Sequence, residues 1–159
     1  RIIEIATIIT DSELNTIAKG PDLVINASDD ELNKMNNYVR DMHTKSGLID
    51  EVRKSSLTIR DAEIETLEFI NEHIKAKNKP PVCGNSIGTD RRFLDAQMND
   101  LENRFHYRVV DVSSIKELAN RWYPDVDRNI PSKAENHRAL EDIIESIEEL
   151  KYYREKLFI

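Results

Sequence analysis

The spacing of apolar residues divides the chain into alternating strand and helix segments. Residues 1–10 and roughly 14–26 are rich in β-branched residues and flank a polar cluster, which predicts a β-hairpin. Two further short strands are predicted over residues 81–85 and 107–112. Helices are expected between and after these strands, so the order of elements predicts an α/β fold.

Helices are predicted where capping residues precede apolar positions that recur every three or four residues. Ser28 followed by Glu31 is a capping box, and Thr58 with Asp61 is a second start signal of the same kind. The helices expected from such signals cover approximately residues 28–40, 48–54, 58–77, 90–101, 113–122 and 136–157.

The last helix follows a segment of different character. Residues 124–136 contain Pro124, Pro131 and several polar side chains, so we expect an irregular connection that is long enough to be mobile or functional. Helices with apolar residues at regular spacing are expected on both sides of this connection. The residues expected on buried helix faces are Ile64, Leu67, Ile70 and Ile74, and in the last helix Leu140, Ile143, Ile144, Ile147 and Leu150.

Composition is that of one domain with a buried core. The chain has 159 residues, of which 39% are hydrophobic and 33% are charged. Its formal charge of −7 argues against binding along extended nucleic acids, because such binding depends on basic grooves that release counterions. A short nucleic-acid substrate stays open, since metal ions can supply the positive charge. The single cysteine, Cys83, is expected to be a buried packing residue in a reducing compartment.

The sequence also bears on location. No apolar run reaches the roughly 20 residues of a membrane span, and no segment has the basic-then-apolar order of a signal peptide. We therefore expect no membrane partner and a cytoplasmic protein. The chain opens at Arg1 and enters at once what reads as an interior strand, so we expect further residues to precede Arg1 in the natural protein.

Two short segments carry the residues with the clearest chemical character. GNSIGTD at 84–90 ends in Asp90 after a glycine-flanked turn, and HRALED at 137–142 joins His137 to an acidic pair. Hard carboxylate oxygens and an imidazole base suit metal-assisted hydrolysis of a phosphodiester. Two carboxylates hold a two-metal centre poorly, and no convincing third acidic position follows in the sequence.

Each of these residues also has a structural interpretation. A lone aspartate such as Asp90 is most often a helix N-cap, and His137 in the first turn of a helix is usually a surface residue. A histidine kept neutral at that positive helix end would, however, be the better base. Asp142 follows His137 by about 140° around an ideal helix, whereas Glu141 competes for the same role on geometry alone. The spacing leaves this choice open.

Longer stretches of the chain resemble one family, the oligoribonucleases, which are DEDDh-type 3′-to-5′ exoribonucleases. The resemblance implies an α/β, ribonuclease H-like fold with a mixed sheet flanked by helices, in a single exonuclease domain over residues 1–159. It also spans nearly the whole chain. The matching stretches are RIIEIATIITDSELN at 1–15, HTKSGLIDEV at 43–52, GNSIGTDRRFL at 84–94, HYRVVDVSSIKELANRWYP at 106–124 and HRALEDIIESIEELKYYR at 137–154.

The resemblance implies roles for residues at matching positions. Asp90 and Asp142 are similar to the acidic residues of the second and third motifs, which bind two divalent ions, Mg²⁺ or Mn²⁺. His137 matches the histidine that activates the attacking water, and Tyr107 joins it as an expected catalytic residue beside the 5′ phosphate and the dimer contact. The residues expected to bind substrate are Tyr38, His43, Asn85, Ser86, Arg108 and Ser113.

The chain departs from the family pattern at one point. The first motif, a strand that carries Asp-x-Glu, belongs just upstream of Arg1 and has no counterpart in the sequence. That strand supplies the remaining metal ligands. Without them we expect the first metal to be held weakly and activity to be nearly abolished.

The sequence therefore predicts a metal-dependent 3′-to-5′ exoribonuclease that degrades short single-stranded RNA, especially dinucleotides, to 5′-mononucleotides. A homodimer is implied by the resemblance. Two alternatives stay open: a proofreading-type DNA exonuclease of the same superfamily, and a non-catalytic fragment that binds nucleotides. Comparing DNA with RNA separates the first, and looking for mononucleotide product separates the second.

Overall fold

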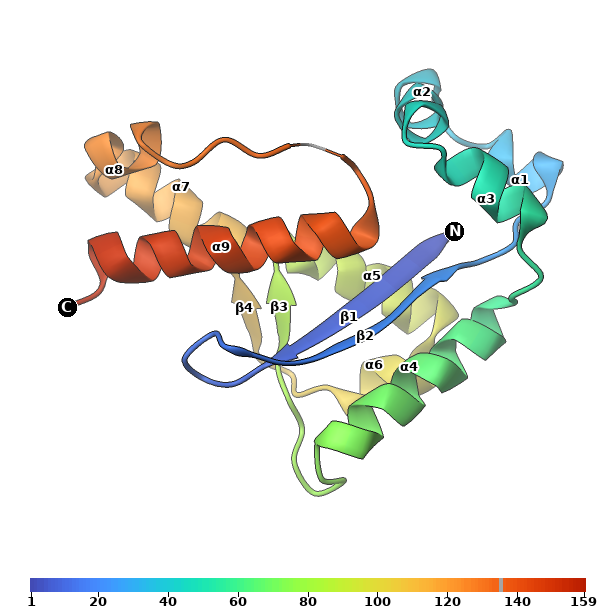
Figure 1. The fold of residues 1–159 in the computed structure, drawn as a ribbon, viewed down its shortest axis with the longest axis horizontal. Coiled ribbons are helices and arrows are strands. Elements are labelled where there is room, and N and C mark those ends of the chain that lie inside the picture. The colour runs from blue at the N-terminus through green and yellow to red at the C-terminus, as the bar shows by residue number, and fades with distance from the viewer. Residues whose placement is uncertain (135) are drawn as a thin grey trace.

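Two small β-sheets form the centre of the computed structural model, which describes residues 1–134 and 136–159 (Figure 1). Strand β1 (Glu4–Thr10) pairs antiparallel with β2 (Thr16–Val24), as the hairpin prediction requires. Strand β3 (Val82–Gly84) pairs in parallel with β4 (Val109–Asp111). The expected single mixed sheet is therefore not present in the described residues, because no strand there pairs with both β1 and β3.

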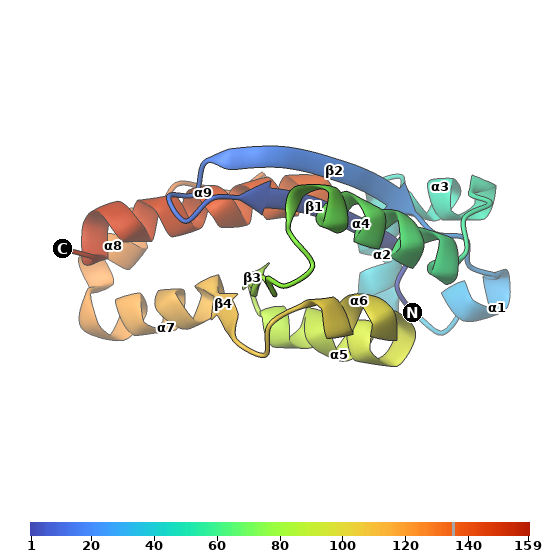
Figure 2. The same ribbon diagram turned by 90° about the horizontal axis from the view of Figure 1, so that it is seen from below.

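Helices cover both sheets and arrange the molecule in two layers. Figure 2 shows β1 and β2 in one layer with α4 and α9, and β3 and β4 in the other with α5, α6 and α7. The helices are α1 (Asp29–Leu32), α2 (Asn37–Lys45), α3 (Leu48–Lys54), α4 (Ile59–His73), α5 (Ile87–Gln97), α6 (Asn99–Arg104), α7 (Val112–Trp122), α8 (Pro124–Arg128) and α9 (Ala139–Leu157).

Two of the predicted helices are each divided in two. The helix expected over 28–40 ends at Leu32, and α2 begins only after Asn36, whose side chain accepts a hydrogen bond from the Val39 amide at 2.8 Å. The helix expected over 90–101 breaks at Met98, where the backbone leaves the helical region with φ −137° and ψ 63°. In the first case Asn36 caps and begins a new helix. In the second case the buried Met98, with its non-helical dihedral angles, ends the helix.

The segment after Trp122 is also more regular than expected. Pro124 opens the short helix α8, where its fixed φ and missing N–H suit the first helical position. The last helix begins at Ala139 rather than at residue 136. None of the helices in the described residues is long and apolar enough to cross a membrane.

Three hydrophobic clusters form the core. The largest joins β2, α4, α5 and α6, and its Ile70 and Leu101 are almost completely buried. Ile64, which was expected on the same face as Ile70, is 40% exposed. A second cluster lies under α1 and α3, and a third joins α7 to α9 around the fully buried Tyr153. Cys83 is exposed, contrary to prediction, because β3 has a strand partner on one side only among the described residues.

Gly20 provides a test of how closely β2 packs on α4. A Cβ added to Gly20 would lie 2.6 Å from the Phe69 ring and 2.9 Å from the Thr7 carbonyl oxygen. Gly20→Ala should therefore lower the free energy of unfolding by about 1–3 kcal/mol, because such overpacking forces the ring or the strand to move. Urea denaturation measures this change.

Gly88→Ala is the matched control. Nothing lies within 4 Å of a Cβ added to Gly88, which is in α5. Alanine there should be neutral or should stabilise the helix by up to about 1 kcal/mol. Equal destabilisation by the two substitutions would contradict the close contact at Gly20.

Candidate functional site

His137 and Asp142 lie at the start of α9 on either side of its first residue. His137 precedes the helix and has a left-handed φ of 56°. The prediction that it lies in the first helical turn is therefore wrong. Arg138, the N-cap, is extended, and its carbonyl oxygen accepts the Asp142 amide at 3.0 Å. Asp142 therefore lies in the first turn, within electrostatic range of the His137 side chain that precedes the helix.

The local environment acts on the Asp142 carboxyl. Partial loss of water around it raises its pKa, and nearby carboxylates act in the same direction. The charge of His137 opposes this effect. Asp142 is accordingly a carboxylate that a bound cation or a proton would stabilise.

Asp90 lies in the first turn of α5 and is not its N-cap. Ser86 holds the cap position with a left-handed φ of 51°, and its amide is shared between the side chains of Asp111 and Ser113, each at 3.0 Å. Partial desolvation raises the pKa of Asp90, and the Asp111 carboxylate adds to this rise. Asp90 thus resembles Asp142 in its electrostatic setting.

A polar network joins the two helices that carry these carboxylates. Asn85 donates to Glu149 at 3.0 Å and to Ser113 at 3.3 Å, and it accepts from Ser146 at 2.5 Å. The Ser146 hydroxyl also lies 3.0 Å from the carbonyl oxygen of Asp142. The turn before α5 is therefore bonded to α9 one turn beyond Asp142. Asn85, Ser86 and Ser113 make hydrogen bonds within the protein at this junction.

Glu149 is a buried residue that the sequence reasoning missed. Its side chain is 1% exposed and forms an ion pair with Lys133 at 2.5 Å. Lys133 belongs to the connection that leads to His137, so this pair fastens the connection to α9. The spacing of Asp142, Ser146 and Glu149, at four and then three residues, was the available signal, because it places them on one helix face.

Helix α2 brings one of its two candidate residues toward His137. His43 is partly buried, its Nδ1 has no hydrogen-bond partner, and burial lowers its pKa. The charge of His137 also lowers that pKa and Glu4 raises it, so the three side chains lie within electrostatic range. Tyr38, at the other end of α2, is 76% exposed and presents its ring to solvent.

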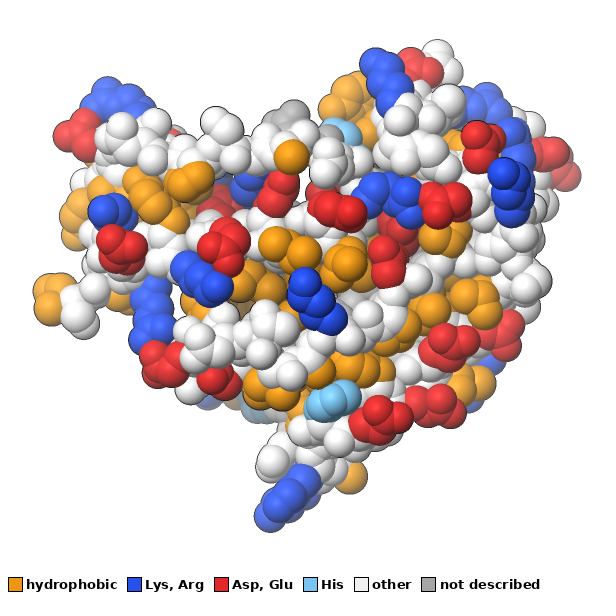
Figure 3. Space-filling view, viewed as in Figure 1, with side chains coloured by type: hydrophobic (Ala, Val, Ile, Leu, Met, Phe, Trp, Pro, Cys, Tyr) orange, Lys and Arg blue, Asp and Glu red, His pale blue; other side chains and the backbone are white. Residues whose placement is uncertain are grey.

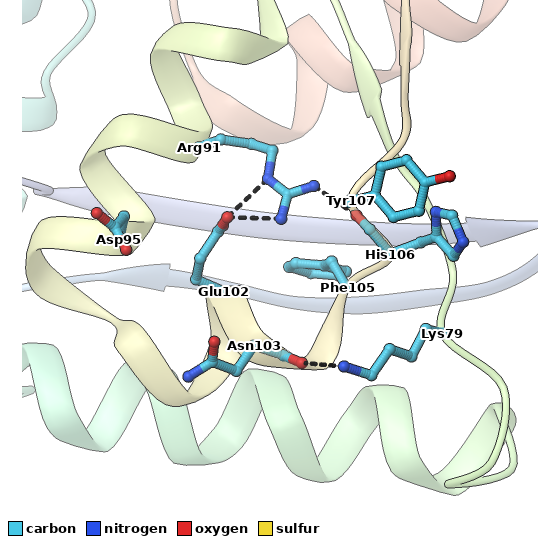
Figure 4. A pocket seen from close by; sticks show the side chains of 8 residues that line it. All are labelled: Lys79, Arg91, Asp95, Glu102, Asn103, Phe105, His106 and Tyr107. Carbon is cyan, nitrogen blue, oxygen red and sulfur yellow. Dashed lines mark hydrogen bonds and ion pairs between the residues drawn. The ribbon is translucent and has the colours of Figure 1, made fainter.

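Tyr107 and Arg108 belong to a different part of the surface. Tyr107 is 76% exposed and lies against the His106 ring at 4.4 Å, while the Arg108 guanidinium is 5.5 Å from the tyrosine ring centre. Tyr107 borders a hollow of about 430 Å³ between α5, α6 and the chain before β4 (Figure 4). Asp90, His137 and Asp142 do not line this hollow, which is formed by Lys79, Arg91, Asp95, Glu102, Asn103, Phe105, His106 and Tyr107.

The described residues do not by themselves make a complete metal centre. Asp90 and Asp142 offer hard oxygen ligands of the kind that Mg²⁺ and Mn²⁺ prefer. Over residues 1–134 and 136–159, however, no three His, Cys, Asp or Glu side chains are grouped so that they could hold a metal ion. The ligand chemistry fits such an ion, but the number of ligands does not.

Acidic side chains gather on the face between the start of α9 and the helices α2 and α3 (Figure 3). Glu4 is 5% exposed at its side chain and accepts hydrogen bonds from Arg138 at 2.9 Å and from the Ala139 amide at 2.8 Å. Arg138 also pairs with Glu51 at 2.6 Å. The acidic cluster of Glu4, Asp22 and Glu51 was not recognised in the sequence, since Glu4 reads there as one polar position in a strand.

Comparisons with known proteins agree closely with one another. An exonuclease family model, that of RNase T, matches residues 1–150. The chain is 54% identical to an oligoribonuclease of Streptomyces avermitilis over 158 residues, which cover 99% of this chain and 78% of that protein. It is 52% identical to an oligoribonuclease of Rhodococcus jostii, over 100% of this chain and 80% of that protein. An oligoribonuclease of Vibrio parahaemolyticus is 51% identical, over 99% of this chain and 86% of that protein.

The acidic cluster generates a pH-dependent prediction at Asp22 on β2. Partial desolvation, followed by the charge and hydrogen bond of Glu4, raises the pKa of Asp22 from 3.8 to about 6. Folded Asp22 then holds a proton that the unfolded chain releases, which contributes stability below about pH 4 that is lost as the pH rises through 6. Wild-type stability should fall over this interval relative to Asp22→Asn.

Urea denaturation of both proteins at several pH values between 4 and 7 measures this difference. The effect should be small, because Asp22 is exposed and water screens its charge. A stability difference that stays constant with pH would contradict the raised pKa.

Proposed function

The chain belongs to the RNase T exonuclease family, and we propose on that premise that it is an oligoribonuclease, a hydrolase that removes nucleotides from short RNA in the 3′-to-5′ direction. The observation that carries this proposal is identity above 50% with oligoribonucleases over nearly the whole chain. The products are 5′-mononucleotides. A ribonuclease H-like arrangement of the α/β elements is part of the same proposal and follows from the family.

Divalent ions, Mg²⁺ or Mn²⁺, are the proposed cofactors, with Asp90 and Asp142 among their ligands. The raised pKa values of both carboxyls support this assignment, since a cation would offset the cost of their partial desolvation. When bound, such ions stabilise charge on phosphate oxygens. Because the described residues supply too few ligands for two ions, the proposal requires further ligands.

His137 is the proposed general base. Its place directly before α9 and its proximity to Asp142 leave the imidazole beside the carboxylate that we assign to the metal. Histidine is the side chain that most often serves as a general base in enzymes. His43, whose pKa burial lowers, is the proposed neutral contact to substrate on the other side of His137.

Short single-stranded RNA is the proposed substrate. The exposed ring of Tyr38 offers a surface on which a base can stack. Tyr107 is the proposed further catalytic contact. Beside its ring, Arg108 supplies a cation suited to the 5′ phosphate. Since they lie apart from His137 in one protomer, they would reach the substrate from a second copy in a homodimer. The proposed substrate contacts at the turn before α5 are Asn85, Ser86 and Ser113.

Cleavage of a 5′-phosphorylated diribonucleotide tests the proposed activity. In the presence of Mg²⁺ or Mn²⁺ the full-length protein should release 5′-mononucleotides, and EDTA should abolish the release, because the proposed reaction depends on bound divalent ions. Chromatography of the products measures it. A matched deoxyribonucleotide and a longer RNA serve as comparisons.

Each outcome of this assay has a defined meaning. Preference for the deoxyribonucleotide would favour a DNA exonuclease. Binding of the diribonucleotide without any product would favour a non-catalytic protein. Release that EDTA does not affect would contradict the metal assignment.

Substitution of the proposed base and metal ligand gives a second test. His137→Gln should lower kcat by about 10²- to 10⁴-fold, the usual contribution of a general base. Asp142→Asn should lower it at least as much, because the amide keeps the size of the side chain and removes its charge. Asp125→Asn, on the exposed helix α8, is the control and should keep full activity. Wild-type activity in Asp142→Asn would refute the assignment.

A further inference from the structure

Arg138 contacts three separate parts of the protein from its position directly after His137. Its guanidinium forms an ion pair with Glu4 of β1 at 2.9 Å and with Glu51 of α3 at 2.6 Å. It also donates to the carbonyl oxygen of Ser46, which ends α2, at 3.4 Å. One side chain thus joins the first strand, the helices α2 and α3, and the start of α9.

The contact with Glu4 is the most buried of the three. The Glu4 side chain is 5% exposed and that of Arg138 is 21% exposed, whereas Glu51 is about half exposed. Glu4 raises the pKa of Arg138 through this hydrogen bond, so the guanidinium stays charged. Removing Arg138 would leave the Glu4 carboxylate buried without its cation, which is costly in a protein interior.

Glu4 also fixes the backbone beside Arg138. One of its oxygens accepts from the Ala139 amide at 2.8 Å, while the guanidinium donates to both of its oxygens. The residue before Arg138 is His137, with its φ of 56°. A non-glycine residue in this region of φ needs support from its surroundings, and the Glu4 contacts hold the two residues that follow it.

The link continues from Arg138 to the proposed substrate helix. The Ser46 hydroxyl lies 3.0 Å from the carbonyl oxygen of His43, and the Ser46 carbonyl oxygen accepts from Arg138. The hydrogen bond between Ser46 and Arg138 therefore joins the end of α2 to the start of α9.

We propose that Arg138 is a positioning residue, which uses Glu4 and Ser46 to hold the His137 backbone in its left-handed conformation and in register with His43. This inference rests on the proposed function, in which His137 is the base. Arg138 itself does not contact the reacting atoms in this role. It sets the direction from which the imidazole approaches water, and a small displacement of such a group slows a reaction greatly.

Arg138→Gln tests the proposal in the full-length protein. With a 5′-phosphorylated diribonucleotide and Mg²⁺, kcat should fall on the order of 10- to 100-fold while KM changes much less. Arg138→Lys keeps the positive charge but cannot donate the paired hydrogen bonds of the guanidinium, so it should give an intermediate kcat. Glu4→Gln should resemble Arg138→Gln, and the double variant should lose little more, because the two residues act together.

Amide hydrogen exchange supplies a readout that does not depend on activity. In Arg138→Gln the Ala139 amide should exchange at least about tenfold faster than in the wild type, because Glu4 loses the cation that holds it in place. Arg121→Gln is the matched control, since Arg121 forms an exposed ion pair with Glu117 within α7. That variant should match the wild type in both measurements.

The possible outcomes separate the two proposals. A normal kcat for folded Arg138→Gln, or additive losses in the double variant, would overturn the positioning role. A lower melting temperature with unchanged kcat would indicate a purely structural role and would also overturn it. If the wild-type protein releases no mononucleotide, the proposed function fails, while the exchange rate at Ala139 still decides whether Arg138 holds this backbone.

Discussion

The two layers of this protein depend on the docking of α9. This helix runs along β1 on one side and reaches β3 and α7 on the other, so it spans both of the small sheets. The buried Glu149 attaches it to the turn before α5 and to the connection before His137, because it accepts from Asn85 and from Lys133 at once. A buried carboxylate is tolerated only when such donors satisfy it. Through Asn85 and Ser146, the same network joins the turn before α5, which carries Asp90, to the helix that carries Asp142.

Local signals in the sequence were sufficient for much of the fold. The hairpin, the capping boxes at Ser28 and Thr58, and the amphipathic helix α4 all follow from short-range preferences. The breaks at Asn36 and Met98 were missed, because apolar periodicity continues through both positions and tertiary packing decides where the helix stops. The separation into two sheets was also missed, since strand pairing is a long-range property that no local pattern encodes.

For the candidate site, the sequence pointed to particular residues, but it did not give their geometry. The motifs drew attention to Asp90, His137 and Asp142, and the ideal helix then placed His137 wrongly in the first turn. The backbone turn at His137 is held by Glu4, more than 130 residues away in the chain. A spacing argument within one helix cannot include such a contact. The acidic cluster around Glu4 shows the same difficulty, because its members come from strands and helices that are distant in sequence.

The sequence distance between Glu4 and Arg138 has a consequence for the order in which the protein assembles. The hydrogen bonds between them join residues that are 134 positions apart. The Glu4 carboxylate of β1 therefore lacks its cation until the residues around Arg138 have been synthesised and have folded back onto the strand. Closing so long a loop is entropically costly and slow. The backbone beside His137, which depends on this contact, is therefore expected to become ordered late in folding, after the two distant segments have met.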